Sequence, residues 1–414
     1  MNKKLFAIFF GIISASVFAQ NTTLSPYSYF GNGQAATIRT AENNAMGGIT
    51  SYADSTQFSL DNPATLGKLQ FVQYAIGANY KMSNQQSEAS SAKTSTAAIN
   101  YLALSVPTKH IAFSFGIKPK SSVGYRIGGT TQLNDLEQRN IYTGMGGVNT
   151  TFLGVAVNPI KGLSLGLSLN YNFGYTEKTL TQGISEVQLN TRLFTRSELS
   201  GVQYTLGMHY SRMILSEYEL QLSAMYVPKS SLESTNTRTI STISTTGAIR
   251  NEQTLNLGTL ANTSNQLSAE TTLGAGFGKL QQWFLGATYA ASSQGITHPL
   301  ETSPDVAYMP TSRFSLGGFY IPKYDSFTNY FSRVVYRVGA RWEHTGLALK
   351  NQDIKDFGIN FGIGLPLGVL SKVNIGVEVG GLGTTDAGLI KEKYTNIMLG
   401  FSLSDIWFIK RKYD

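Results

Sequence analysis

The sequence of 414 residues contains no cysteine, and charged residues make up only 14% of it. The absence of cysteine excludes disulfide bonds, thiolate metal sites and a cysteine nucleophile. No stretch after the first twenty residues approaches the roughly 18 uninterrupted apolar residues that span a membrane as a helix. The four histidines of the chain show no paired metal-ligand spacing: His110, His209, His298 and His344. We therefore expect no metal, no cofactor and no enzymatic activity.

Segments that alternate between apolar and polar residues are the main pattern of the chain, and residues 163–175 (LSLGLSLNYNFGY) are the clearest example. Because successive side chains of a strand point to opposite faces, this segment has one apolar face and one small, polar face. The same combination recurs along the chain, as expected if one face meets lipid and the other lines a lumen. Only helices and closed barrels satisfy every backbone group within lipid. The pattern therefore predicts an all-β protein, a transmembrane antiparallel β-barrel.

The alternation predicts fourteen strands. They cover residues 69–82, 95–106, 110–118, 150–157, 163–175, 199–210, 217–227, 268–278, 282–292, 312–321, 331–344, 355–365, 372–380 and 394–404. Short connections alternate with longer polar ones such as 119–149 and 176–198, as in barrels with short periplasmic turns and long outer loops. An even strand number places both termini in the periplasm. After residue 68, every proline falls in or beside a predicted connection, which agrees with proline's inability to donate into a ladder.

The N-terminal part of the chain shows a different pattern. Residues 1–19 combine a basic start, an apolar centre and a Val17-Phe18-Ala19 cleavage pattern, which predicts a secretory signal peptide. Residues 20–68 do not alternate, whereas 69–414 form the predicted barrel. Because the lumen of a fourteen-stranded barrel is wider than its own side chains fill, we expect residues 20–68 to be a plug. Small residues such as Gly47, Gly48 and Ala64 would let it pack closely against the wall.

One short motif supports this arrangement. Asn62-Pro63-Ala64 precedes the first predicted strand and resembles the Asn-Pro-Ala motif that follows the hatch helices of FadL-type outer-membrane fatty-acid transporters. AMGG (45–48) fits the same family, and four other segments resemble a poorly characterised FadL-like branch: SPYSYFG (25–31), NYFSRVVYRVG (329–339), GIGLPLG (362–368) and WFIKRKYD (407–414). The resemblance implies an N-terminal hatch and a lateral exit at a kink in the third strand. Pro119 and Gly124 would supply that kink; alternatively, Pro119 simply begins the outer loop.

Charged residues of one predicted strand form a candidate lumen site. Alternation places four of them on one face: Arg333, Arg337, Arg341 and Glu343. An arginine on the lipid face would cost roughly 2–4 kcal/mol near the midplane, so these side chains are expected in the lumen. Parity offers three acidic partners: Asp356, Glu378 and Glu219. The arginines would either hold a carboxylate headgroup or form an ion-pair network that ties the plug to the wall, and we favour the network.

The sequence thus predicts an outer-membrane barrel for passive uptake of hydrophobic small molecules such as long-chain fatty acids through a plugged lumen. The alternative is a non-conducting FadL-like barrel that acts as a subunit or scaffold of an outer-membrane secretion or assembly complex. A porin-like diffusion channel is a third option, less favoured if the plug exists. Expected partners are outer-membrane lipids, a hydrophobic ligand and, in the alternative, other outer-membrane proteins. A net charge of +8 without a basic run interleaved with aromatics gives no indication of nucleic-acid binding.

Overall fold

The computed structural model describes residues 23–36, 38–57, 59–133, 135–214, 217–293, 298–300, 303–367 and 370–405. Fourteen strands form one closed antiparallel ring: β2 (Val72–Gln86), β3 (Ser91–Pro107), β4 (Ile111–Leu133), β5 (Leu136–Ile160), β6 (Leu163–Ile184), β7 (Leu189–Ile214), β8 (Tyr218–Val227), β12 (Glu270–Lys279), β13 (Trp283–Ser292), β15 (Ser312–Tyr320), β16 (Val335–Leu349), β17 (Gln352–Leu367), β18 (Ser371–Leu382) and β19 (Lys391–Asp405). Pairing of β19 with β2 closes the ring. The predicted barrel is therefore confirmed, and each predicted strand corresponds to one strand of the ring. The predicted signal peptide and the basic tail Lys410-Arg411-Lys412 lie outside the described residues.

The two faces of each strand differ as the alternation predicts. On β6, Leu165, Leu167 and Leu169 point outward and are 40–47% exposed. Ser164 and Ser168 of the same strand point inward and are buried. An exposed apolar band around the outside of a closed ring is the surface that a bilayer covers. In the described part of the chain, no helix is long and apolar enough to cross a membrane.

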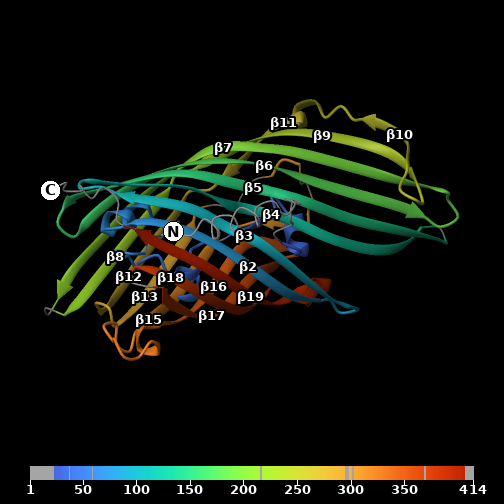
Figure 1. The fold of residues 1–414 in the computed structure, drawn as a ribbon. Coiled ribbons are helices and arrows are strands. Elements are labelled where there is room, and N and C mark those ends of the chain that lie inside the picture. The colour runs from blue at the N-terminus through green and yellow to red at the C-terminus, as the bar shows by residue number, and fades with distance from the viewer. Residues whose placement is uncertain are drawn as a thin grey trace, which may run out of the picture.

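The barrel is much taller on one side. β5 has 25 residues and β7 has 26, whereas β13 has 10 and β15 has 9. At about 3.3 Å per residue a strand of this greater length reaches roughly 80 Å, well beyond the 9–11 residues that a crossing needs. In Figure 1 the green strands β5, β6 and β7 run far past the rest of the ring. Three further strands widen this extension: β9 (Ser230–Ser244), β10 (Ile249–Thr254) and β11 (Asn262–Leu267).

Two expectations about the connections are therefore wrong. Most of 119–149 and 176–198 is strand rather than loop, because β4 pairs with β5 as far as Leu133. Most of their outward side chains are polar, so these residues lack the outward apolar alternation that marks a lipid-facing strand. Prolines also occur inside strands: Pro119 lies in the middle of β4, and Pro159 and Pro366 lie near the ends of β5 and β17. Pro119 is tolerated because it stands at a β-bulge, where the ladder is already interrupted.

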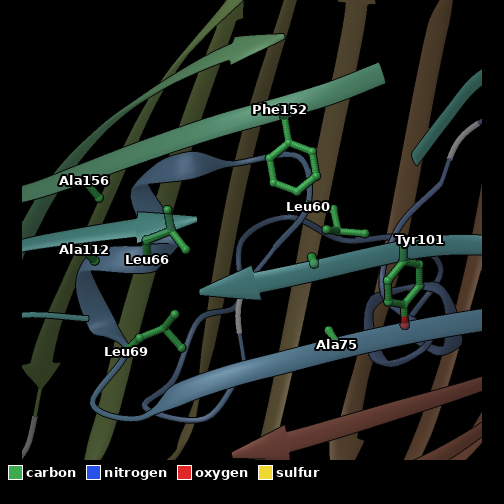
Figure 2. Packing of buried hydrophobic residues seen from close by; sticks show 9 residues of the cluster. Leu60, Leu66, Leu69, Ala75, Tyr101, Ala112, Phe152 and Ala156 are labelled. Atoms are coloured by element: carbon green, nitrogen blue, oxygen red, sulfur yellow. The ribbon is translucent and has the colours of Figure 1, made fainter. Parts of the chain in front are cut away.

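The described residues of the N-terminal segment, 23–36, 38–57 and 59–71, lie inside the ring. The segment contains η1 (Pro26–Tyr29), the two-residue strand β1 (Gln34–Ala35), α2 (Ala41–Ala45) and η2 (Pro63–Lys68). α2 contacts β16 to β19, and η2 contacts β4 to β7 on the other side of the ring. Leu60, Leu66 and Leu69 of the segment belong to one buried apolar cluster with Tyr101 and Phe152 of the wall, and Figure 2 shows Leu60 beside Phe152. The remaining elements lie in connections: η3 (Gly258–Ala261), β14 (Val306–Tyr308), η4 (Phe331–Arg333) and η5 (Asp386–Gly388).

Candidate functional site

The Asn62-Pro63-Ala64 motif is one of two points at which the segment lies very close to the wall. Asn62 caps η2, since its Oδ1 accepts from Ala64 N at 3.0 Å, and its Nδ2 donates to the Met208 carbonyl of β7 at 3.3 Å. Gly166 of β6 and Gly207 of β7 face this turn. A Cβ on Gly207 would lie 2.3 Å from Asn62 Oδ1, and one on Gly166 would lie 2.4 Å from Ala64 N. The motif therefore packs against a part of the wall where two glycines, which have no side chain, leave room for it.

Gly47 and Gly48 form a second tight contact, at the turn that ends α2. Both adopt left-handed conformations, with φ of +69° and +79°, which glycine reaches without steric strain. A Cβ on Gly339 of β16 would lie 2.1 Å from Gly47 N, and one on Gly317 of β15 would lie 2.1 Å from the Met46 carbonyl oxygen. This turn consequently lies backbone to backbone against the wall.

A triad of one buried and two half-buried ionisable side chains ties the segment to β4. Asp61 Oδ2 accepts from Arg39 Nε at 2.7 Å, and Asp61 Oδ1 lies 3.2 Å from Lys118 Nζ. Lys118 also donates to the Leu60 carbonyl at 2.9 Å. Burial alone would raise the pKa of Asp61, but Lys118 and Arg39 outweigh it and lower that pKa to about 2. Asp61 therefore stays ionised and holds a cation of the wall.

The arginines of β16 are placed differently from one another. Arg341 bonds three carboxylates at once: Glu378 at 2.8 Å, Asp356 at 2.8 Å and Glu343 at 3.1 Å. It also donates to the Tyr394 hydroxyl at 2.8 Å. All five side chains come from β16 to β19, so this network joins wall strands to one another. Because its donors are already bonded to three acids, Arg341 has little capacity to hold a ligand carboxylate.

Arg337 does connect the wall to the segment, through an amide. Its Nη1 donates to Asn374 Oδ1 at 3.0 Å, and Asn374 Nδ2 donates to Glu42 Oε1 of α2 at 2.7 Å. Arg333 lies outside the strand face on which alternation placed it. It belongs to η4, before β16 begins, and its guanidinium lies 5.4 Å from the centre of the Tyr330 ring. The prediction was wrong for Arg333 because alternation applies only within a strand, and β16 begins two residues later, at Val335.

The strands β3 and β4 separate part of the way up the wall. Their pairing covers only Leu102–Pro107 of β3 and Ala112–Ile117 of β4. Above this point, among the described pairings, β3 pairs with β2 alone, while β4 continues with β5 across the bulge at Pro119. We call this separation the notch: it has residues 91–101 of β3 on one side and 118–133 of β4 on the other. Ile99, at 68% exposure, points outward beside it, so the notch begins within the apolar band.

The N-terminal segment takes over the β4 edge that β3 leaves. β1 pairs antiparallel with residues 121–122 of β4, and Ala36 N donates to the Lys120 carbonyl at 2.9 Å. Further along the same edge, Ser28 Oγ lies 3.0 Å from both the N–H and the carbonyl oxygen of Gly124. Pro119 and Gly124 thus both lie at the notch. Pro119 does not begin a loop, and Gly124 contacts the segment.

Above the segment, the lumen contains a cavity of about 590 Å³. Apolar side chains such as Phe152 and Leu232 contribute to its wall, but ionisable groups line it from two directions. One group is the Arg39, Asp61 and Lys118 triad. The other is the network around Arg341. Among the described residues, no three His, Cys, Asp or Glu side chains are grouped so as to hold a metal ion.

Sequence reasoning missed several residues of this site. Tyr394 appears apolar and would suit a lipid-facing belt, yet it is 5% exposed and bonds Asp356 Oδ1 at 2.8 Å. Its position in the alternation indicated this, because Leu399 and Phe401 of the same strand point outward at odd positions, so the even position 394 faces the lumen. Glu219, expected beside the arginines, instead pairs with Lys68 of the segment. The Asp61 triad had no periodic signal, since its members come from loop and strand.

A closed fourteen-stranded barrel, filled by its own N-terminal segment and notched beside its third strand, defines a FadL-type outer-membrane barrel fold. The BamG family model matches residues 1–414, and the chain therefore belongs to the BamG family. No curated protein matches the chain significantly.

Several solved structures share this fold. The CymD monoaromatic hydrocarbon channel has 14% identity and a TM-score of 0.56, over 89% of this chain and 98% of that one. The toluene transporter TodX of Pseudomonas putida has 16% identity and a TM-score of 0.55, over 90% and 98%. The toluene transporter TbuX of Ralstonia pickettii has 13% identity and a TM-score of 0.55, over 88% and 98%. At such identities the likeness concerns the fold alone.

Proposed function

We propose that the protein is a bacterial outer-membrane barrel, with its short turns in the periplasm, that acts as a non-conducting subunit of an outer-membrane protein assembly or secretion complex. The observation that carries this proposal is that the N-terminal segment occupies both routes through the barrel. It spans the lumen between opposite walls, and it hydrogen-bonds the free edge of β4 in the notch. The family name, BamG, points to association with other outer-membrane proteins.

The electrostatics of the lumen favour the same function. A hydrophobic solute on its way to the notch would have to pass the Arg39–Asp61–Lys118 triad, whose charges face the cavity. Displacing the segment would separate Asp61 from Lys118 and leave one of the two charges unpaired. Breaking a buried pair in this way costs several kcal/mol, which passive uptake has no energy source to supply.

The extended sheet offers a surface for a partner protein. Its inward face carries an apolar row in which each residue is paired with the next across neighbouring strands: Ile127, Tyr142, Leu180, Leu193 and Ile240. All five side chains are half-buried or exposed. Because the strands here reach beyond the membrane band, this row faces water unless another protein covers it. An exposed apolar row on an ordered sheet is a typical protein-binding surface.

Purification from the native host in mild detergent tests this proposal with two neighbouring substitutions on β6. Leu180→Asp places a charge in the apolar row, whereas Thr181→Asp places the same charge on the opposite face. We expect the wild-type protein and Thr181→Asp to retain a stoichiometric protein partner and Leu180→Asp to lose it. Wild-type protein that carries no partner, or that takes up labelled fatty acid into liposomes in a saturable way, would overturn the proposal.

The notch favours a second candidate function, passive uptake of hydrophobic small molecules with lateral release. The similar solved structures include toluene transporters and a monoaromatic hydrocarbon channel. Because the chain has no cysteine, Ala35→Cys with Ser121→Cys would lock β1 to β4 by a disulfide. Uptake into liposomes that stops when this bond forms and returns on reduction would establish lateral release. Uptake that is absent, or indifferent to the lock, would refute it.

A further inference from the structure

The connection between β15 and β16, residues 321–334, differs from the other turns at its end of the barrel. The turns after β3, β5 and β12 contain only two or three residues. This one presents four aromatic rings to solvent, with exposed fractions of 100% for Phe327, 71% for Phe331, 46% for Tyr324 and 40% for Tyr330. We call Tyr324, Phe327, Tyr330 and Phe331 the aromatic foot. Neither the barrel nor the lumen requires these rings.

The foot is held out by an ordered loop. Lys323 N donates to the Ser332 carbonyl at 2.8 Å, which joins the two ends of the loop. Within it, Asn329 N donates to Ser326 Oγ at 3.2 Å, and Phe331 N donates to Asn329 Oδ1 at 3.0 Å. Ser326 itself is buried. Because the loop bonds itself in this way, the exposed rings are presented by a defined backbone.

The foot adjoins the surface that faces lipid. Tyr336, at the start of β16, points outward with 40% exposure and pairs across the ladder with the equally outward Tyr320. The Tyr336 hydroxyl donates to the Phe331 carbonyl at 3.4 Å, and the Tyr330 hydroxyl donates to the Pro366 carbonyl of the next connection at 3.2 Å. These bonds place the foot at the short-turn end of the barrel, next to the outward face of the wall. In Figure 1 the orange connection between β15 and β16 projects from the ring at this end.

The charges around the foot complement a phospholipid headgroup. Lys323 and Arg333 flank the aromatic residues, with Asp325 between them, so the loop has a net positive charge. Arg333 lies over the Tyr330 ring at 5.4 Å, which combines a cation and an aromatic side chain at one position. Aromatic rings beside basic groups are the side chains that lie at the boundary between acyl chains and headgroups.

We propose that the aromatic foot anchors the barrel in the leaflet at its short-turn end. Phe327 and Phe331 enter the boundary between headgroups and acyl chains, and Lys323 and Arg333 approach lipid phosphates. The continuity of the foot with the outward face at Tyr336 favours lipid over a protein partner as its occupant. This anchoring depends on the transmembrane barrel alone and holds whether or not the protein serves an assembly complex.

The cysteine-free chain allows a direct test. A nitroxide label on Thr328→Cys keeps all four rings, and the barrel is placed in nanodiscs of phosphatidylethanolamine and phosphatidylglycerol. Collision rates with oxygen and with a water-soluble nickel chelate then report the depth of the label. Leu316→Cys on the outward face of β15 serves as the membrane reference, and Lys109→Cys in the exposed turn after β3 serves as the water reference.

We expect the ratio of oxygen to nickel collisions at Thr328→Cys to exceed that at Lys109→Cys several-fold. Adding Phe327→Ser and Phe331→Ser should return the ratio to the water reference while leaving the ratio at Leu316→Cys unchanged. A ratio equal to the water reference with the rings intact would overturn the proposal. So would a label that is open to nickel in nanodiscs but shielded in native membranes, because a protein would then cover the foot.

Discussion

Asp61→Asn is the substitution that most directly tests how the N-terminal segment is held. It removes the negative charge that Arg39 and Lys118 share, at 2.7 Å and 3.2 Å, and leaves two cations facing each other. Removal of one partner from a fully buried pair costs about 3–5 kcal/mol. Asp61 is 18% exposed and Lys118 is 19%, so a loss near the lower end, about 3 kcal/mol, is expected.

The pKa of Asp61 gives an independent magnitude. A fall from 3.8 to about 2 corresponds to roughly 2.5 kcal/mol at neutral pH. Because the pKa is lower in the docked state, this stabilisation is present above about pH 4 and is lost as the pH falls towards 2. The substituted protein lacks the group, so this part of its docking should not change over the same pH window.

Hydrogen exchange of residues 38–57 in nanodiscs measures the docking. A loss of about 3 kcal/mol corresponds to roughly a hundredfold fall in protection. Lys118→Met should restore part of that protection in the Asp61→Asn background, because it removes one of the unpaired cations. Unchanged protection in Asp61→Asn would refute the assignment of the triad as the tether. So would equal protection losses in Asp61→Asn with and without Lys118→Met.

Three further substitutions test separate contacts. Gly207→Val should displace the Asn62 turn and lower the thermal unfolding midpoint by the equivalent of about 1–3 kcal/mol, whereas Gly129→Val, with open space around its Cβ, should not. Arg341→Met leaves three wall carboxylates unpaired and should destabilise the barrel by about 3–5 kcal/mol in urea titration; Arg250→Met on the exposed β10 is the control. Ser28→Ala should speed amide exchange at the free edge of β4 several-fold and leave barrel stability within about 1 kcal/mol, since it removes only the local bonds of one hydroxyl to Gly124 and to the Ser25 carbonyl. Equal effects of a substitution and its control, or unchanged exchange for Ser28→Ala, would contradict the corresponding contact.

The fold was predictable because alternation states which face of a strand meets lipid. This information stops where the membrane stops. Above it, β4 to β7 continue with mostly polar residues on the outward face, so the sequence resembles a loop while the backbone keeps pairing. The predicted strand around Leu163 therefore had the correct start, whereas its end at Tyr175 fell nine residues short of Ile184.

The site was less predictable for a different reason. Parity placed Arg341, Asp356 and Glu378 on the same side of neighbouring strands, and the structure brings them together. No such rule applies to Asp61 and Lys118, which meet only because an irregular segment folds back into the ring. Which residues of a loop meet which residues of the wall depends on tertiary packing. The sequence of each segment contains no repeating pattern that predicts this contact.

The notch unites these observations. Within lipid, an unpaired strand edge leaves backbone N–H and carbonyl groups without partners, which is costly. The pairing of β4 with β3 ends just before Pro119 and its bulge, and β1 with Ser28 then supplies partners to residues 120–124 from inside the barrel. This part of the wall therefore takes its hydrogen-bond partners from a segment that is not a strand of the ring. A seam of this kind stays closed while the Asp61 triad holds, and the exchange experiment on Asp61→Asn measures how firmly it does so.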